Sequence, residues 1–336
     1  MKIKRLCIDR QQSENSLAVA HDGQWIVLKR LLCLYPEDKS DQCVRLSQTA
    51  DDLIGFLQSL PETGDKLRLL LASADLGACR QTKEMQEIIP FRPLSHRGFS
   101  LFESHAFGGP KSFKHVKHMW SGPYSYEKPF KKMHPHLHHK KTFSDNPLYY
   151  KGNPLTFVGS NETVVFPEYA TLLDYELELG AIITKDVFNA TEEEGLEAIG
   201  ALCVFNNFCA RNVLLKEMSI PGFGPSKARD FGSSISNIVV TADEILPYLN
   251  ILKARVFING KITARGKLSD FHHSLGSMVA YASRGERVYA GEFMGTGTIP
   301  NCCGAENGQM LKQGDLVRLE IDRIGEVANP IYKASM

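Results

Sequence analysis

Hydrophobic and polar residues alternate along much of this chain, so most of the predicted elements are short strands. The run 16–28 alternates around an Asp-Gly pair and the run 256–266 around an Asn-Gly pair. Both dipeptides suit the tight turns between antiparallel strands, so each run predicts a β-hairpin. The segment 314–331 alternates as well and predicts two late strands.

Helical spacing is rare in the first part of the chain. Residues 48–60 have the apolar spacing of a helix, with Thr49 as its cap and Pro61 beyond its end. The apolar run 66–72 then predicts another strand. Residues 1–92 are therefore predicted as a small, β-rich N-terminal domain.

The remainder, residues 93–336, also combines strands with few helices. Residues 191–208 begin as a helix capped at Thr191, with acidic residues in its first turn, and end as a strand. The run 269–283 predicts an amphipathic helix capped by Ser269. Short strands with one or two helices favour a mixed or rolled β domain of the α+β type over a doubly wound sheet.

The segment 106–147 differs from its surroundings because it lacks apolar periodicity and is dense in Gly, Pro, Lys and His. The run 133–141 (MHPHLHHKK) holds four of the eleven histidines. Such a cluster is capable of binding a metal, but a loop flanked by lysines is typically solvated surface. The composition therefore predicts a lid or a mobile loop.

Charge and cysteine content limit the classes of function. The 336 residues contain 39 Lys and Arg against 38 Asp and Glu, which gives no support to binding of nucleic acid or an anionic membrane. The start lacks the apolar stretch of a signal peptide, and no apolar run approaches the length of a membrane span. Eight scattered cysteines without CxxC spacing indicate reduced thiols in a cytoplasmic protein.

Two glutamates stand one residue apart in an otherwise apolar run, LLDYELELG (172–180). Side chains alternate faces along a strand, so Glu176 and Glu178 are predicted to point the same way. Two carboxylates on one face repel each other. Either the face is solvated and carries neighbouring Lys or Arg, or the pair holds a hard cation through its oxygens.

Seven separated motifs occur in a recognisable order: YYKGNPLTFVG (149–159), LLDYELELGAIITKD (172–186), VFNNFCARN (204–212), SKARDFGSSIS (226–236), VFINGKITARG (256–266), GTGTIPNCCGAENGQMLKQGD (295–315) and IDRIGEVANPI (321–331). This order resembles the fumarylacetoacetate hydrolase family, in particular its bacterial members with a small N-terminal β domain. The resemblance implies a rolled mixed-β C-terminal domain, a homodimer and one divalent metal ion. It also implies a small-molecule substrate, because family members cleave or rearrange β-dicarbonyl acids through C–C hydrolysis, decarboxylation or tautomerisation.

The resemblance also implies roles for single residues. Glu176 and Glu178 match metal ligands for Mg²⁺, Ca²⁺ or Mn²⁺. His105, in RGFSLFESHAF, matches the general base, and His115 is a second candidate for that role. Glu306, in CGAENG, aligns with a glutamate of the bacterial members that would orient such a base.

Four further residues match positions that lie beside the substrate. Tyr150 matches a tyrosine that contacts the substrate, and Arg211 matches the arginine of an NDxxARD motif. Lys227 matches a lysine beside the metal and the substrate oxygens. Thr298 matches a threonine near the substrate carboxylate, where glycines let backbone N–H groups approach an anion.

Three positions depart from the family pattern. Asn207 replaces an aspartate that is a metal ligand, and Gly98, seven residues before the histidine, replaces another. Asn212 replaces the last residue of the ARD motif. Because cation affinity depends on the number of charged ligands, we expect Mg²⁺ to bind weakly or not at all. Lys227 is then the expected cation beside the two glutamates, with Asn207 as a neutral ligand.

Three functions remain open on the sequence. The first is a metal-dependent hydrolase or lyase that acts on a β-dicarbonyl acid. The second is a metal-independent biosynthetic enzyme on the same fold, such as a cyclase, a dehydratase or a condensing catalyst. The third is a non-catalytic binding protein.

Overall fold

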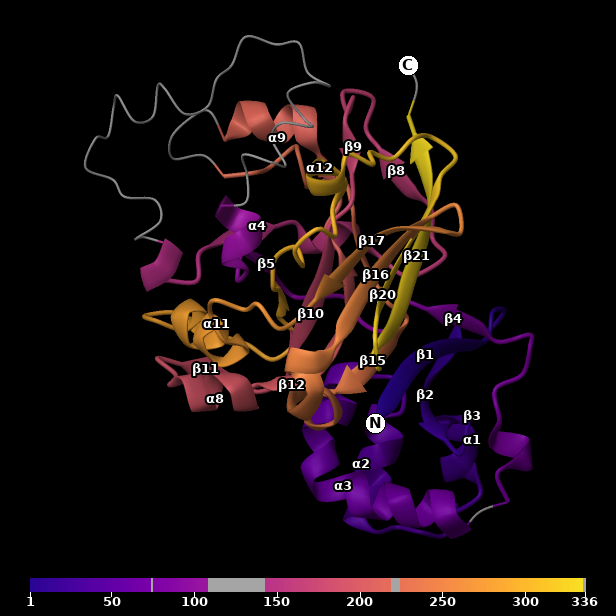
Figure 1. The fold of residues 1–336 in the computed structure, drawn as a ribbon. Coiled ribbons are helices and arrows are strands. Elements are labelled where there is room, and N and C mark those ends of the chain that lie inside the picture. The colour runs from indigo at the N-terminus through magenta and orange to yellow at the C-terminus, as the bar shows by residue number, and fades with distance from the viewer. Residues whose placement is uncertain (74, 108–142, 219–223, 335–336) are drawn as a thin grey trace.

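A mixed β-sheet runs from the N-terminal unit into the larger unit in the computed structural model, which describes residues 1–73, 75–107, 143–218 and 224–334 (Figure 1). The main order of its strands is β3 (Gln24–Val27), β2 (Glu14–His21), β1 (Lys2–Asp9), β15 (Ile238–Thr241), β12 (Ile199–Asn206), β10 (Leu177–Ile183), β19 (Phe293–Gly295), β5 (His96–Phe99) and β6 (Tyr149–Gly152). Strands β14 (Ser233–Ile235) and β7 (Phe157–Val158) extend it beside β12, and β4 (Gln86–Ile88) pairs with β1. The strands are mostly antiparallel, with parallel pairing between β19 and β5 and between β14 and β7.

A second sheet has the order β17 (Lys261–Lys267), β16 (Lys253–Ile258), β20 (Leu316–Ile321), β21 (Gly325–Lys333) and β8 (Val164–Phe166). It contains the two predicted late strands, β20 and β21. Both predicted hairpins are confirmed. Asp22 and Gly23 have φ angles of 47° and 74°, and Asn259 and Gly260 have 51° and 77°, as the tight turns between antiparallel strands require.

The N-terminal unit shares the core of the larger one. Strand β1 pairs with β15, so residues 1–27 extend the main sheet at one edge. Ile3 and Phe56 lie in one buried cluster with Phe205 and Phe293. The domain boundary near residue 92 stays a prediction, but burial on both sides of it is continuous.

The N-terminal helices correct two predictions. Helix α3 runs from Leu53 to Ser73, through Pro61 and through the segment 66–72 that was predicted as a strand. The apolar spacing of a helix continues past the proline, and Thr63 bonds back to the carbonyl of Ser59, so burial of one face outweighs the lost N–H. Thr49 is the last residue of the preceding helix rather than a cap. The elements here are α1 (Leu28–Cys33), α2 (Asp41–Thr49), α3 and η1 (Gly77–Cys79).

Two helices of the larger unit pack against each other, α8 (Glu192–Glu197) and α11 (Leu275–Ala282). The predicted cap at Thr191 is confirmed as a capping box with Glu194. The prediction for α11 was wrong at its start, because Ser274 rather than Ser269 accepts from the N–H of Ser277 and begins the helix. Other short elements are α4 (Glu103–Phe107), η2 (Pro154–Thr156), β9 (Leu173–Asp174), β11 (Val187–Phe188), β13 (Cys209–Ala210), α9 (Arg211–Glu217), α10 (Ala242–Ile245), η3 (Leu246–Ile251), β18 (Arg287–Val288) and α12 (Gly304–Asn307).

Several further points concern the surface. Most of the predicted lid and the candidate base His115 lie outside the described residues. Among the described helices, none is both long and apolar enough to span a membrane.

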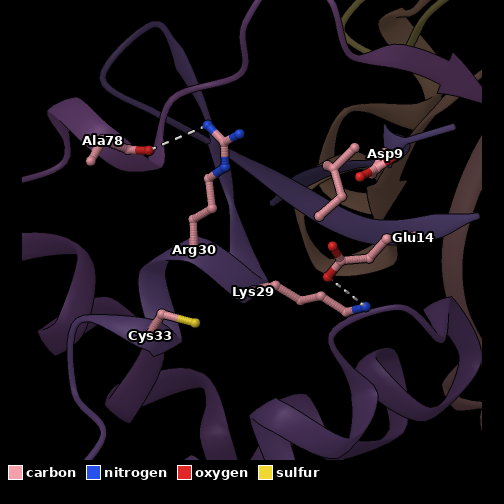
Figure 2. A pocket seen from close by; sticks show the side chains of 7 residues that line it. Asp9, Glu14, Lys29, Arg30, Cys33 and Ala78 are labelled. Atoms are coloured by element: carbon pink, nitrogen blue, oxygen red, sulfur yellow. Dashed lines mark hydrogen bonds and ion pairs between the residues drawn. The ribbon is translucent and has the colours of Figure 1, made fainter. Parts of the chain in front are cut away.

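A cavity of about 450 Å³ opens in the N-terminal unit, where Lys29 pairs with Glu14 and Arg30 donates to the carbonyl of Ala78 (Figure 2). Two of the charged side chains that line the cavity, Lys29 and Glu14, thus pair with each other, and Arg30 contacts the backbone.

One buried histidine is enclosed by aromatic rings. The His96 ring, on β5, lies edge-on to Phe157, Phe205 and Tyr150, with Phe293 also against it. Neither ring nitrogen has a hydrogen-bond partner among the described residues. Burial, with a smaller contribution from the nearby charge of Arg229, lowers the pKa of His96 to about 3. The histidine is therefore neutral in the folded protein.

This burial predicts a pH-dependent loss of stability. In the unfolded chain His96 has the ordinary histidine pKa of about 6.5, so it takes up a proton as the pH falls below that value. In the folded chain it stays neutral over the same pH range. Lowering the pH from 7 to 5 should therefore cost about 2 kcal/mol of unfolding free energy through this residue. Urea unfolding at both pH values checks this, because His96→Leu should remove that part of the loss. An equal loss in wild type and variant would contradict it.

Candidate active site

The two glutamates of the E-x-E motif are buried at the start of β10, in the middle of the main sheet. Glu178 lies on β10, and Glu176 forms a bridge with Cys303 just before that strand. Glu178 accepts from the Asn207 side-chain amide at 2.9 Å and from the N–H of Gly297 at 2.8 Å. Gly297 has φ +87°, a conformation that an L side chain rarely adopts, and an added Cβ would lie 2.7 Å from a backbone oxygen. The glycine thus presents its N–H to the carboxylate.

Two arginines neutralise Glu176. The guanidinium of Arg211 donates to one carboxylate oxygen, which also accepts from Arg229 at 2.9 Å. The other carboxylate oxygen lies 2.8 Å from a second nitrogen of Arg229. The side chain of Arg229 is only 10% exposed, so this is a buried carboxylate with its counter-charges supplied by the protein.

Asp174 extends the acidic pattern by one more alternate position and connects it to helix α12. It is fully buried and accepts from Arg211 Nε at 2.6 Å. It also accepts from the N–H groups of Gly304 and Ala305 at 2.7 and 3.1 Å, at the beginning of that helix. One carboxylate therefore fixes both an arginine of the site and the helix that carries Glu306.

Helix α12 brings Glu306 to His105. The Nδ1 atom of His105, on α4, lies 2.9 Å from Glu306. The thiol of Cys303 donates to the other oxygen of that carboxylate at 3.5 Å, and burial raises the pKa of Cys303 well above its usual range. The donor atoms of these three side chains all lie within 4.8 Å of one another. With Nδ1 held by Glu306, Nε2 is the ring nitrogen left to exchange a proton.

Tyr150 fills the place where a side chain at position 98 would project. An added Cβ on Gly98 would lie 2.2 Å from the Tyr150 ring. The Tyr150 hydroxyl donates to Asn207 Oδ1 at 3.0 Å, and the ring lies 5.4 Å from the Arg229 guanidinium. Tyr150 thus contacts Gly98 and Asn207, two positions at which the sequence departs from the family pattern, and it lies beside the Arg229 guanidinium.

The two glutamates have opposite shifts in pKa. Burial, together with the charge of Glu176, raises the pKa of Glu178 to about 8. Burial also disfavours the charged form of Glu176, but Arg229 and Arg211 outweigh it and hold the pKa of Glu176 well below its usual range. The pair is therefore asymmetric, with a carboxylate at Glu176 and a largely protonated acid at Glu178 near neutral pH.

The donor atoms do not fit a divalent cation in this arrangement. A hard ion such as Mg²⁺ needs several free carboxylate or carbonyl oxygens. Both oxygens of Glu176 accept from guanidinium groups, both oxygens of Glu178 accept from N–H groups, and Asn207 Oδ1 accepts from Tyr150. Arg229 also places a positive charge against the carboxylate that would have to bind the ion.

Lys227 is not the cation at the glutamates, which corrects the prediction. It is exposed, and its backbone N–H donates to Glu217 at 2.8 Å. The same carboxylate accepts from the N–H and hydroxyl groups of Ser226, both at 2.9 Å. This capped turn leaves Lys227 outside and directs Arg229, two residues later, inward to Glu176.

Of the other residues singled out in the sequence, Thr298 has a hydroxyl without a partner among the described residues, whereas Arg211 and Asn212 bond to other protein groups. Thr298 is 1% exposed, and its hydroxyl has no hydrogen-bond partner among the described residues. Arg211 contacts Asp174 and Glu176, so it supports the carboxylates of the site. Asn212 has a structural contact, because its Oδ1 accepts from the N–H groups of Thr171 and Leu172.

Sequence reasoning missed three residues of this arrangement. Asp174 shares the spacing of Glu176 and Glu178 in the run DYELE, so periodicity alone could have found it. Arg229 stands close to Lys227 in SKARD, and only the geometry of the turn distinguishes them. Cys303 carried no sequence signal, since it is one of eight scattered cysteines.

Comparisons with known proteins agree with the fold. A family model described as "Fumarylacetoacetate (FAA) hydrolase C-terminal" matches residues 119–332. A homoprotocatechuate catabolism bifunctional isomerase/decarboxylase from Escherichia coli is 26% identical over 187 residues, which are 56% of this chain. The match covers 41% of that relative, so the chain spans well under half of its length.

Two solved structures have the same architecture. A fumarylacetoacetate hydrolase from Exiguobacterium antarcticum superposes with a TM-score of 0.68 at 19% identity, over 99% of this chain and 100% of that one. A maleylpyruvate hydrolase from Sphingobium sp. SYK-6, in complex with manganese(II) and pyruvate, gives a TM-score of 0.64 at 16% identity, over 100% of both chains. At these identities the likeness establishes the fold alone.

The contacts of Asp174 generate a stability prediction. Asp174→Asn replaces a buried anion that holds Arg211, and it directs an amide donor at backbone N–H groups. We expect a loss of about 3 kcal/mol in unfolding free energy, as for removal of one partner from a buried ion pair. Urea unfolding measures this, with Asp270→Asn, at an exposed aspartate, as the control. A loss no larger than that of the control would contradict the role of Asp174.

Proposed function

The chain belongs to the fumarylacetoacetate hydrolase family, and we propose that it is an enzyme that acts on a small β-dicarbonyl acid through proton transfer to or from carbon. The observation that carries this proposal is the His105–Glu306 pair, at 2.9 Å, beside the buried carboxylate and arginine cluster. A histidine oriented by a carboxylate is suited to general acid–base catalysis.

The pair supplies the proton-transfer step. A carbon between two carbonyl groups is acidic, because the resulting enolate spreads its charge over both oxygens. His105 Nε2 takes a proton from that carbon or returns it, while Glu306 holds Nδ1 and stabilises the charged imidazolium. Tautomerisation, decarboxylation and C–C cleavage all pass through such an enolate. The proposed function therefore includes all three reactions and is not limited to hydrolysis.

Cationic and neutral donors around the enolate complete the proposed site. Arg229 supplies the positive charge, and Thr298 offers a buried hydroxyl with no partner among the described residues. Positioned donors of this kind stabilise negative charge that develops during a reaction. The relatives named above include a bifunctional isomerase/decarboxylase, and the proposed proton transfer at carbon would serve an isomerisation or a decarboxylation by this chain.

A metal-dependent hydrolase is the alternative within the family. It is disfavoured by the donor set, because the oxygens of Glu176 and Glu178 already accept hydrogen bonds from protein groups. A binding protein without catalysis is disfavoured by the His105–Glu306 pair, since a ligand site alone does not require an oriented base. Assembly as a homodimer stays a prediction from the family.

The proposed chemistry is tested by following keto–enol conversion of 2,4-dioxo acids and of oxaloacetate through the ultraviolet absorbance of the enol. Proton NMR of the same samples detects decarboxylation or C–C cleavage. His105→Gln should lower the enzymatic rate roughly 10²- to 10⁴-fold, because the base is lost. Glu306→Gln should also lower it, by less, since it leaves the ring in place without its charged partner.

His21→Gln, at the end of β2 in the N-terminal unit, is the control and should keep the wild-type rate. A wild-type protein that accelerates none of these conversions while it binds the acids would support the binding protein. A fully active His105→Gln variant would remove His105 from the mechanism.

A further inference from the structure

The Arg229 guanidinium has one nitrogen without an acceptor among the described residues. Its two terminal nitrogens contact Glu176, and one of them also donates to the backbone carbonyl of Asn207 at 3.2 Å. Its Nε is buried and has no hydrogen-bond partner among the described residues. A buried charged donor without an acceptor is costly, so an oxygen of a bound ligand would be stabilised there.

The surrounding residues fix this guanidinium rather than leave room for another cation. Tyr150 lies against its face at 5.4 Å and donates to Asn207, whose amide in turn donates to Glu178. An aspartate at position 98 would have to displace the Tyr150 ring, because its Cβ would lie 2.2 Å from that ring. The contacts of Gly98, Tyr150 and Asn207 thus all support the same arrangement, in which the Arg229 guanidinium lies beside them with its positive charge.

We propose that Arg229 is the resident cation of this site and binds a carboxylate or enolate oxygen of a 2-oxo acid in place of a divalent metal ion. This inference rests on the proposed function for the class of ligand. The geometry is that of a planar donor group held by a carboxylate on one side, with Nε left for the ligand. The ion pair with Glu176 fixes the orientation of the guanidinium before the ligand arrives, which lowers the cost of ordering it on binding.

The direct test is calorimetric titration of oxalate, a planar dianion that resembles the enolate of a 2-oxo acid. Wild-type protein in excess EDTA should bind oxalate, and added Mn²⁺ in place of EDTA should not tighten binding. Arg229→Gln should weaken binding roughly 10- to 100-fold, which corresponds to the loss of a charged hydrogen bond. Arg229→Lys, which keeps the charge but has no second planar donor, should fall between the two.

Arg265→Gln is the matched control, because Arg265 is an exposed arginine of β17, and it should bind oxalate like wild type. Thermal unfolding of each variant shows whether it is folded, and Arg229→Lys gives the answer if Arg229→Gln is not. Oxalate binding that requires Mn²⁺, or that is absent under both conditions, would overturn the proposal. Wild-type affinity in both Arg229 variants would overturn it as well.

The same protein samples separate this inference from the proposed function. Metal-free oxalate binding that depends on Arg229, together with no turnover of any dicarbonyl acid, would leave Arg229 as the anion site and reject the enzyme. Turnover that is lost in EDTA, with oxalate binding lost in parallel, would keep the enzyme and reject Arg229 as its cation.

Discussion

The ion pair between Glu176 and two arginines is the interaction on which the rest of the site depends. A carboxylate buried in the middle of a sheet is stable only if its charge is compensated. Arg211 and Arg229 provide that compensation from two separate segments that both follow Glu176 in the chain, one at the beginning of α9 and one in the turn before β14. Their positive charges keep Glu176 ionised, and its negative charge helps keep Glu178 protonated.

Asp174 extends this interaction to the candidate catalytic pair. Its carboxylate accepts hydrogen bonds both from Arg211 and from two backbone N–H groups at the beginning of α12. Glu306 on that helix then meets His105. Ion pairs, hydrogen bonds and the short backbone of α12 therefore connect the buried carboxylates to the histidine. The acidic run 174–178 thus fixes the helix whose Glu306 contacts the base.

Local patterns predicted the elements that local chemistry decides. Alternation and Asp-Gly or Asn-Gly pairs predicted both hairpins, and Thr191 with acidic residues after it predicted a capped helix. The spacing of Glu176 and Glu178 predicted that they share one face, but left open whether that face is solvated; the structure shows both of them buried. The second half of helix α3 was predicted as a strand, because local rules treat Pro61 as a helix end, whereas burial of the apolar face carries the helix through it.

The sequence predicted Lys227 rather than Arg229 as the cation beside the glutamates for a different reason. Lys227 and Arg229 are two basic residues in one short motif, and only the capping of their turn by Glu217 decides which one faces inward. The contact of Tyr150 with Gly98 joins residues far apart in sequence, so no local pattern reveals it. Sequence alone showed that two acidic ligands of the family are missing, but not that the Tyr150 ring lies against Gly98 or that Arg229 pairs with Glu176.

The most direct test of this account is a crystal structure of the wild-type protein soaked with Mn²⁺, examined by anomalous scattering at the manganese edge. The account predicts no manganese peak between Glu176 and Glu178, with the Arg229 guanidinium against Glu176. A fully occupied manganese ion bound by both glutamates, with Arg229 displaced from them, would contradict it.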